Sequence, residues 1–562
     1  MLLHLLVLAP FVAAILMVAT SKEDPKSSSR LAFLFALAFF GMSIANIAAG
    51  NNATEAYEWF RIPGAKGPVY YFLNSNGLAA WMVFLSTGLS LVALITARNT
   101  TCKNYRNFAI GIFALMGAMN GTFLAADAVL FFFFFEAMVI PAAVLIAGFG
   151  GKDRAKAAMT FAIYTLVGSA PMMVALWYLI SQSDSSLVLS LAKTLQSLPE
   201  GAQIAILVSF LLAFMVKTPI FPFHGWQAIS YSEAPAPLSA ILTGAMSKAG
   251  VFGFIAWVLP IFTLSESVLS ILSTVMWLGL VTAVYGALMA LRATDAKKLL
   301  AFSSMGHLGL AVAGVFSLSE AMLPAVLVLL VAHGISAGAQ FLLMGIAERM
   351  TGTRELDKLG ALSRVTPVFG TLFGFVAILA LAIPGTAGFV GEFTVLMSLW
   401  DMGPAAALVA GLCIILSAAY MLRFVQKVIF GEQKCEVTGT RMTALEGSSI
   451  GIMGVLLLVF GMHPAFITNA LHLFDEQVIE TMVKLTEEKS AAVDASEELG
   501  EEGAAPSSIP GVETENDEKI SELKSNLAAE GLSEEEIASI IQQIHEMEAE
   551  IAAEDAVEGG NK

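Results

Sequence analysis

Cysteine is nearly absent from this chain: its 562 residues include three, Cys102, Cys413 and Cys435, and they are far apart. Such spacing provides neither a disulfide framework nor the ligand set of a zinc or iron–sulfur site. The chain also lacks the glycine-rich motifs that bind phosphate groups or dinucleotides. We therefore expect no bound cofactor, no metal and no nucleic-acid partner for this chain.

Charged residues are scarce as well, at 14%, whereas hydrophobic residues make up 57% of the chain. An average soluble protein has about 25% charged residues. The net charge of −16 is concentrated at the C-terminal end, since residues 484–562 hold 22 acidic and 5 basic side chains. The rest of the chain is therefore almost neutral and strongly apolar.

Long apolar runs dominate the sequence. A membrane-spanning helix needs about 20 apolar residues, and about fourteen such runs can be counted. We predict an all-α polytopic membrane protein with about 14 transmembrane helices in a lipid bilayer. Their approximate ranges are 2–20, 31–49, 76–96, 107–125, 128–149, 159–181, 203–225, 237–260, 267–291, 298–316, 319–346, 366–398, 404–430 and 446–474.

Basic residues mark one side of this predicted bundle. The loops after the odd-numbered helices, with the adjoining helix ends, hold 20 Lys and Arg residues, whereas the loops on the other side hold Arg61, Lys66 and Lys193. Basic loop residues stay on the cytoplasmic side of a membrane. We expect a protein of the bacterial inner membrane with both termini on the outer, periplasmic side.

Four charged residues interrupt the apolar runs: Glu136, Lys217, Lys248 and Glu392. A charge that faces lipid at mid-helix costs about 2.5–3.5 kcal/mol, so four would cost roughly 10–14 kcal/mol. That is most of the net stability of an ordinary domain. The four side chains must therefore face a protein interior or a wet cavity, as expected of a protein that moves ions or protons.

Proline and glycine interrupt two of the predicted helices at mid-span. The motif KTPIFPFHGW breaks the seventh helix directly after Lys217, and IPGTAGFVGEF breaks the twelfth before Glu392. Non-helical backbone at membrane depth is tolerated where it is buried in protein or lines a cavity. Two such breaks in corresponding places indicate two inverted repeats, helices 4–8 and 9–13. At either position a proline kink without a transport role is the alternative.

Several long motifs follow one another in an order that carries a family resemblance. They are FFFFFEAMVIPAAVLIAGFGGKDRAKAAMTFAIYTLVGS, KTPIFPFHGWQAISYSEAPAPLSAILTGAMSKAGVFGF, RATDAKKLLAFSSMGHLGL, LVAHGISAGAQFLLMG and IPGTAGFVGEF. Together they resemble the antiporter-like subunit M (chain 4 in mitochondria) of proton-pumping NADH–quinone oxidoreductase, respiratory complex I. The resemblance covers roughly residues 75–435.

The resemblance implies a role for each buried charge. A glutamate on the fifth helix pairs with a lysine on the seventh, and a lysine on the eighth is the central proton carrier. Histidines on the tenth and eleventh helices extend the hydrated path. A glutamate on the twelfth distinguishes this subunit from its two paralogues, which have lysine there. In this chain these residues are Glu136, Lys217, Lys248, His307, His333 and Glu392.

The resemblance also implies partners. This subunit would be one proton pump in a large complex, coupled to quinone reduction elsewhere in it. The flavin, the iron–sulfur clusters and the quinone are then expected in partner subunits, and paralogous antiporter-like subunits are expected as neighbours. Homologous subunits of a multisubunit sodium/proton antiporter or a membrane-bound hydrogenase share the fold and are the main alternative. An assembly scaffold whose charges are vestigial is a third reading.

We divide the chain into four parts on this basis. Residues 1–106 form the N-terminal membrane helices, 107–435 the proton-translocating core, 436–483 the last transmembrane helix and 484–562 an acidic tail. Two amphipathic stretches separated by Gly531 predict a helical hairpin in the tail. The hairpin is either a solvated appendage or a docking element on a neighbouring subunit, and its partner is not indicated.

Structural readings compete with these functional ones. Glu136 and Lys217 can form a static buried pair, which rarely adds stability over apolar packing. Lys248 can be a structural lysine, and His307 and His333 can be hydrogen-bonded core residues.

The chain also departs from the resembled family in two places. After KTPIFPFHGW it has QAISY where Leu-Pro-Asp-Ala-His is common, and Asn76 stands where aspartate is usual. Asp127 opens the fifth helix, so it either caps that helix or serves as a proton entry point.

Overall fold

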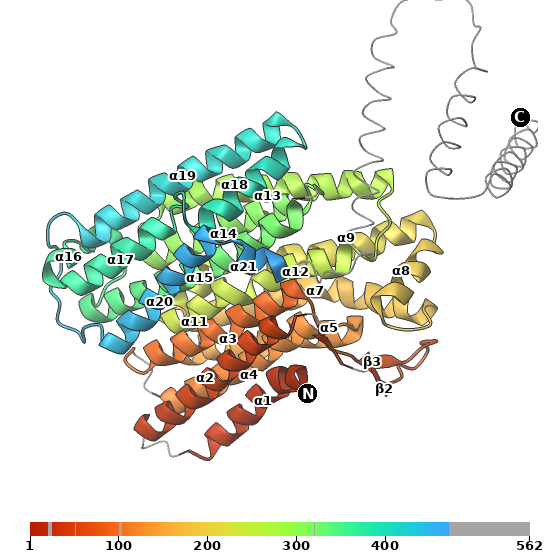
Figure 1. The fold of residues 1–562 in the computed structure, drawn as a ribbon, viewed down its shortest axis with the longest axis horizontal. Helices are drawn as coiled ribbons and strands as arrows, with labels where there is room; N and C mark the ends of the chain where they lie inside the picture. Colours follow the sequence, from red (N-terminus) through yellow and green to blue (C-terminus); the bar gives the residue numbers. More distant parts are fainter. Residues whose placement is uncertain (21–24, 51, 55, 101–103, 320, 471–562) are drawn as a thin grey trace, which may run out of the picture. The chain divides into compact units, whose positions relative to one another are not determined.

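A computed structural model describes residues 1–470 with the exception of 21–24, 51, 55, 101–103 and 320. The predicted acidic tail and its hairpin lie outside these residues. The described part is a bundle of apolar helices with two small strand pairs (Figure 1). This confirms the predicted all-α membrane architecture.

Twelve helical stretches in the described part are long and apolar enough to cross a membrane. In chain order they are α2 (Pro25–Ala49), α3 (Gly77–Ala97), α4 (Tyr105–Leu124), α5 (Ala128–Ala137) with α6 (Val139–Phe149), α7 (Arg154–Gln182), α9 (Glu200–Lys217), the stretch α11 (Ala236–Ile241), η1 (Leu242–Met246), α12 (Lys248–Gly253) and η2 (Phe254–Val258), then α13 (Glu266–Arg292), α14 (Ala296–Val315), α15 (Met322–Thr351), α19 (Pro404–Ile429) and α20 (Ala444–Met462).

Shorter elements complete the bundle. Three are apolar: α1 (Leu2–Val18), α17 (Pro367–Leu379) and α18 (Ala387–Trp400). The others are α8 (Val188–Gln196), α10 (Gln227–Glu233), η3 (Leu356–Lys358), α16 (Leu362–Val365), α21 (Ala465–Thr468), and the strands β1 (Asn52–Ala53), β2 (Tyr57–Phe60), β3 (Val69–Tyr71) and β4 (Asn74–Ser75). The exact total of fourteen spans, and the inverted repeats, stay predictions.

Several approximate helix boundaries differ from the structure, among them two that differ by six residues or more. The second helix begins at Pro25 rather than at residue 31. The last long helix ends at Met462 rather than at residue 474, because Pro464 follows and lacks the N–H that would continue the helix. The short strand pairs β1–β4 and β2–β3 were not predicted at all, since two to four residues leave no readable period.

Both predicted helix breaks are present. Helix α9 ends at Lys217, and turns separate it from α10, while residues 380–386 separate α17 from α18. Two further irregularities were not predicted. The π-helical turns η1 and η2 flank α12, and the fifth predicted helix is divided at Met138 into α5 and α6. Every break therefore lies within a few residues of one of the buried charges.

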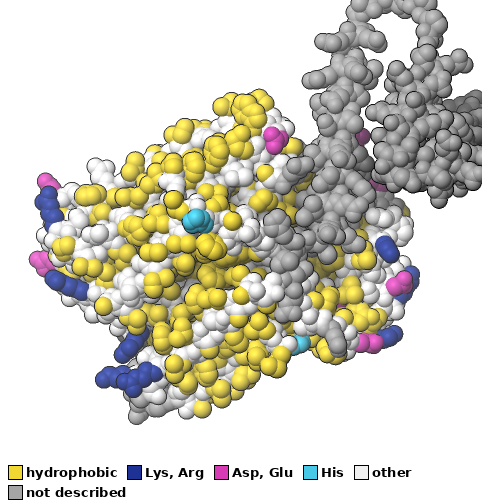
Figure 2. All heavy atoms as spheres, viewed as in Figure 1, with side chains coloured by type: hydrophobic (Ala, Val, Ile, Leu, Met, Phe, Trp, Pro, Cys, Tyr) yellow, Lys and Arg dark blue, Asp and Glu magenta, His cyan; other side chains and the backbone are white. Residues whose placement is uncertain are grey.

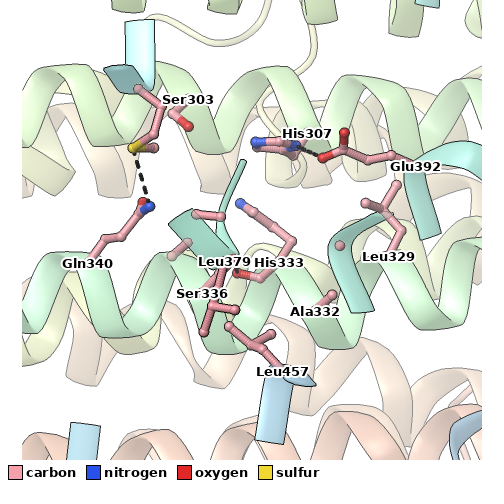
Figure 3. Close-up of a pocket in the computed structure, with 14 residues that line it drawn as sticks. Ser303, His307, Leu329, Ala332, His333, Ser336, Gln340, Leu379, Glu392 and Leu457 are labelled. Atoms are coloured by element: carbon pink, nitrogen blue, oxygen red, sulfur yellow. Dashed lines mark hydrogen bonds and ion pairs between the residues drawn. The ribbon is translucent and has the colours of Figure 1, made fainter. Parts of the chain in front are cut away.

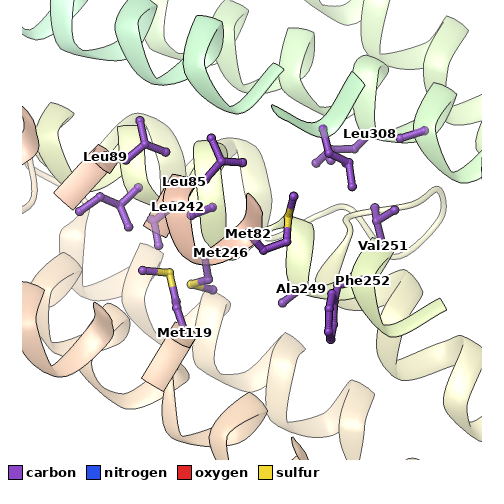
Figure 4. Close-up of a cluster of buried hydrophobic side chains, with 14 of the residues drawn as sticks. Met82, Leu85, Leu89, Met119, Leu242, Met246, Ala249, Val251, Phe252 and Leu308 are labelled. Atoms are coloured by element: carbon purple, nitrogen blue, oxygen red, sulfur yellow. The ribbon is translucent and has the colours of Figure 1, made fainter. Parts of the chain in front are cut away.

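The long helix α15 lies at the centre of the bundle. It packs against α3, α11, α14, α17, α18 and α20. Close by, Leu85 and Leu89 of α3 meet Leu242 and Met246 of η1 in a fully apolar cluster (Figure 4). This apolar packing lies beside α12, the segment that carries Lys248.

The outer surface of the bundle suits a bilayer. Figure 2 shows a broad hydrophobic face, with the Lys, Arg, Asp and Glu side chains at its two ends. Helix α7 illustrates the pattern, since Ile163, Val167 and Val174 are all more than half exposed. Exposed apolar side chains on a membrane helix face lipid or a neighbouring subunit.

Candidate functional site

Lys217 is the last residue of α9, and its side chain is only 2% exposed. Its Nζ donates a hydrogen bond of 3.3 Å to the backbone oxygen of Phe135 and lies 4.5 Å from the centre of the Phe135 ring. The α9 helix ends here because the following turns cannot continue its hydrogen-bond pattern. The broken helix thus presents a buried ammonium group to α5.

Glu136 lies next to this contact in the chain. Both of its carboxylate oxygens are buried and have no hydrogen-bond partner. The direct Glu136–Lys217 pair that the resemblance implies is not formed within 4.0 Å here, because the lysine bonds to the neighbouring carbonyl instead. The two charged groups are therefore neighbours without a direct ion pair. A pair that works as a switch must have an open state of this kind as well as a closed one.

Gly250 lets the eighth predicted helix approach the break behind Lys217. A Cβ atom at this position would lie 2.0 Å from Oγ1 of Thr218 and 2.6 Å from the backbone oxygen of Phe214. Any larger residue would push α12 away from α9. The glycine therefore allows α9, which carries Lys217, and α12, which carries Lys248, to pack closely against each other.

Lys248 is completely buried in α12. Its Nζ lies 2.9 Å from Nδ1 of His333 on α15 and also donates a hydrogen bond to the backbone oxygen of Thr243. The η1 and α15 backbones meet at Gly244 and Gly334, where a Cβ atom on either would lie under 3.0 Å from the other's backbone oxygen. This close approach brings the lysine within reach of the histidine.

His307 of α14 continues the series. Its ring centre lies 5.2 Å from that of His333, and its Nδ1 lies 3.1 Å from Oε1 of Glu392 on α18. Its other nitrogen, Nε2, lies 3.4 Å from the hydroxyl of Tyr420, which in turn is 2.8 Å from the Ser303 hydroxyl. Both ring nitrogens of His307 therefore have polar partners.

A small cavity lies between these groups (Figure 3). Its lining includes His307, His333, Gln340 and Glu392, and it reaches Leu379 at the break between α17 and α18. About 20 Å³ of it is open to water, which is roughly enough for one molecule. Two buried polar atoms are without a protein partner, Nε2 of His333 and Oε2 of Glu392. Water in this cavity can therefore join the histidines and the glutamate.

The structure thus brings four of the six predicted site residues into one connected series, and places the other two as an adjacent pair. The series runs from α12 to α18 and consists of Lys248, His333, His307 and Glu392. The pair is Glu136 with Lys217.

Sequence reasoning missed Tyr420 and Ser303. Both are buried and contact the series through His307. A serine on an apolar helix and a tyrosine near a helix end carry no signal by themselves. Only the position of Ser303 four residues before His307, hence on the same helical face, could have indicated it.

A charged network at one end of the bundle was also missed. Arg354 bonds to Glu233 at 2.6 Å and to Asp295 at 2.7 Å, while Lys297 bonds to Glu348 at 2.9 Å. Lys297 is only 4% exposed, so this ion pair is buried on the lysine side. These contacts join the loops that follow α10, α13 and α15.

Asp127 caps α5, one of the two roles that its sequence position indicated. Its carboxylate accepts hydrogen bonds from the backbone N–H groups of Val129, Leu130 and Tyr70, and from the hydroxyl of Ser186. Asn76 likewise caps α3, accepting from Ala79 at 2.9 Å. The departure from aspartate at position 76 therefore leaves the cap in place.

Comparison with known proteins gives this geometry its context. Residues 125–417 match the family described as NADH:quinone oxidoreductase/Mrp antiporter, TM. The chain belongs to this family. NADH-quinone oxidoreductase subunit M of Rickettsia prowazekii is 30% identical over 427 residues, which cover 76% of this chain and 86% of the relative. The resemblance to subunit M is therefore confirmed.

Solved structures of this antiporter-like family agree. A chain of respiratory complex I from Thermus thermophilus with bound NADH superposes with a TM-score of 0.76 at 30% identity, over 86% of this chain and 100% of that one. A chain of the Mrp complex from a Dietzia species superposes with a TM-score of 0.72 at 20% identity, over 85% and 98% of the two chains. The second match shows the shared fold alone.

Proposed function

We propose that this chain is a proton-translocating subunit of a bacterial NADH–quinone oxidoreductase and that protons move along its buried charges. The connected series Lys248–His333–His307–Glu392 supports this most directly, because each step is bridged by a hydrogen bond, an ion pair or a water-sized cavity. Membership of the family supports the second part of the proposal, that this chain works together with a redox enzyme. Flavin, iron–sulfur clusters and quinone then belong to partner subunits.

The Glu136–Lys217 pair acts as the switch at one end of the series. Burial disfavours the charged form of each group, while pairing favours both. Breaking the pair therefore promotes release of the lysine proton toward Lys248, and re-forming it draws a proton back. Among the described residues, neither Glu136 oxygen has a close hydrogen-bond partner and Lys217 donates to a backbone carbonyl rather than to a carboxylate, so the pair is free to form and to break.

Glu392 takes the proton at the other end. His307 passes the proton to the carboxylate through Nδ1, which lies 3.1 Å from Oε1 of Glu392, since histidine gains and loses a proton near neutral pH. The break between α17 and α18 lies beside Glu392, so the carboxylate is the group nearest to an exit. The positive-inside pattern supports an exit on the outer, periplasmic side, where we also place both termini.

A multisubunit sodium/proton antiporter is the alternative, because the matched family also covers Mrp antiporters and the fold occurs in an Mrp complex. The two functions differ in their partners. We expect a mild-detergent pull-down of this chain from its native membranes to recover flavin- and iron–sulfur-containing NADH dehydrogenase subunits, identified by mass spectrometry. Recovery of small antiporter subunits without any redox protein would contradict the proposed function and favour the alternative.

A further inference from the structure

A second cavity lies far from the buried charges, where α20 begins. Its walls are the end of α15, the first turn of α17 and the first turns of α20 with the loop before them. Its volume is about 440 Å³, within the range of about 300–1,000 Å³ that small-molecule sites occupy. The helices α16, α17 and α20 meet at this end of the bundle (Figure 1).

The cavity wall combines apolar side chains with one cation. The lining includes the apolar side chains of Met350, Val368, Phe369 and Met442, and Val368 is 76% exposed. Arg441 also lines the cavity, and its guanidinium has no hydrogen-bond or ion-pair partner among the described residues. An unpaired cation beside an apolar wall is suited to a ligand that is anionic at one end and apolar at the other.

The loop that carries Arg441 is held in place by its neighbour Arg349. The Arg349 guanidinium donates to both carboxylate oxygens of Glu446, at 2.6 and 2.9 Å, and to the backbone oxygens of Thr440 and Arg441. Glu446 also bonds Thr443. The Glu446 carboxylate is therefore already neutralised by Arg349, and the positive charge of Arg441 remains free for a ligand.

The first turn of α17 adds two donors to the same wall. The Thr366 hydroxyl donates to the backbone oxygen of Leu362 at 2.8 Å and does not cap α17. The N–H groups of Val368 and Phe369, both in the lining, are therefore uncapped. Amides at a helix N-terminus favour an anion, which reinforces the charge of Arg441.

We propose that this cavity binds an anionic phospholipid, with the phosphate at Arg441 and an acyl chain along Val368 and Met442. We expect a membrane lipid rather than a soluble anion because the cavity lies at the end of three helices that we place in a bilayer. It also lies on the side that holds the excess of basic loop residues, where anionic lipids are attracted to Lys and Arg.

The test uses the assembled complex reconstituted in vesicles that contain phosphatidylglycerol or phosphatidylcholine with a photoactivatable acyl chain. After irradiation and proteolysis, mass spectrometry locates the labelled peptides. We expect phosphatidylglycerol to label residues 366–369 and 441–448 more strongly than phosphatidylcholine. Arg441→Gln should lower that preference about fivefold, the effect of roughly 1 kcal/mol per basic residue, whereas the exposed Lys434→Gln should leave it unchanged.

A second variant tests the space inside the cavity independently of the charge of Arg441. Gly447→Leu fills the cavity from the α20 side and keeps Arg441, so it should reduce labelling by both lipids. Equal labelling by the two lipids, or an unchanged preference in Arg441→Gln, would overturn the proposal. So would a cross-link from this cavity to a neighbouring protein subunit, because that would identify a protein as the occupant. None of these outcomes depends on proton transport.

Discussion

At the scale of single residues, His307 is the centre of the site because it contacts groups on both sides. Its Nδ1 lies 3.1 Å from Glu392, and its Nε2 faces the Tyr420 hydroxyl. A histidine that is bonded at both nitrogens has a fixed ring orientation and tautomer. Tyr420 is thus a positioning residue: its hydroxyl contacts His307 and Ser303, and it acts on proton transfer through His307.

Tyr420→Phe removes the hydroxyl and leaves the ring packing. We expect proton translocation to slow by about two- to twelvefold, which corresponds to the 0.5–1.5 kcal/mol of one hydrogen bond. Proton uptake by vesicles that contain the assembled complex measures this, with complex content and melting temperature as checks on folding. Ser303→Ala, which spares the contact with His307, should have the smaller effect. Equal and full activity in both variants would show that Tyr420 has no positioning role.

The sequence predicted the six site residues individually, but not how they are joined. Charges within apolar runs are visible without a structure because their cost demands a reason. The contact between Lys248 and His333, by contrast, depends on the glycine-mediated approach of η1 and α15. Residues 85 positions apart in the chain leave no local pattern, and polar groups such as Ser303 and Tyr420 are chemically ordinary until that packing is known.

At the scale of elements, short contacts between charged side chains lie at the ends of helices. Glu233, the last residue of α10, accepts from Arg354 at 2.6 Å and from the Asp153 N–H at 2.9 Å. Burial raises the pKa of Glu233, but these hydrogen bonds and the Arg354 charge outweigh it and leave the pKa below its ordinary value of about 4.5. Folding therefore favours the ionised carboxylate.

A carboxylate whose pKa is lower in the folded state stabilises that state above its ordinary pKa and loses this effect as the pH falls through the folded value. We expect Glu233→Gln to lower the melting temperature of the purified complex at pH 7, since one charged hydrogen bond contributes about 1.5–3 kcal/mol. The difference from the unsubstituted protein should shrink below about pH 4.5. A difference that stays constant across this range would rule out the ionised Glu233–Arg354 contact.

Element breaks were predictable from proline and glycine, whereas π-helical turns were not. The motifs after Lys217 and before Glu392 contain residues that cannot continue a helix. The turns η1 and η2 contain no proline, and nothing in the sequence indicated them. The division of the fifth helix at Met138, by contrast, lies three residues before Pro141, which cannot donate the backbone hydrogen bond that would continue the helix.

At the scale of the whole molecule, the orientation in the membrane decides where protons enter and leave. The native Cys435 lies on the side that is rich in Lys and Arg and is partly exposed, whereas Cys413 is buried. We expect a membrane-impermeant thiol reagent to label Cys435 in inside-out vesicles and not in intact cells. In a Cys435→Ser, Cys102→Ser background, Lys66→Cys should show the reverse. The opposite pattern would invert the proposed topology.

The overall architecture was the most predictable level, because the apolar runs and the order of motifs are properties of the whole chain. Membership of the antiporter-like family followed from motifs spread over about 360 residues. Features that depend on a few residues, such as the strand pairs and the second cavity, emerged only from the structure. The short β2–β3 pair, for example, has no apolar period to read.

The most direct measurement is the number of protons pumped per NADH oxidised by the complex that carries Lys248→Met. This residue begins the connected series and contacts His333 directly, at 2.9 Å. We predict that the ratio falls, or that pumping and NADH oxidation fall together, while Lys298→Met on the exposed surface leaves both unchanged. A wild-type ratio at a wild-type rate in Lys248→Met would contradict proton transfer through this series.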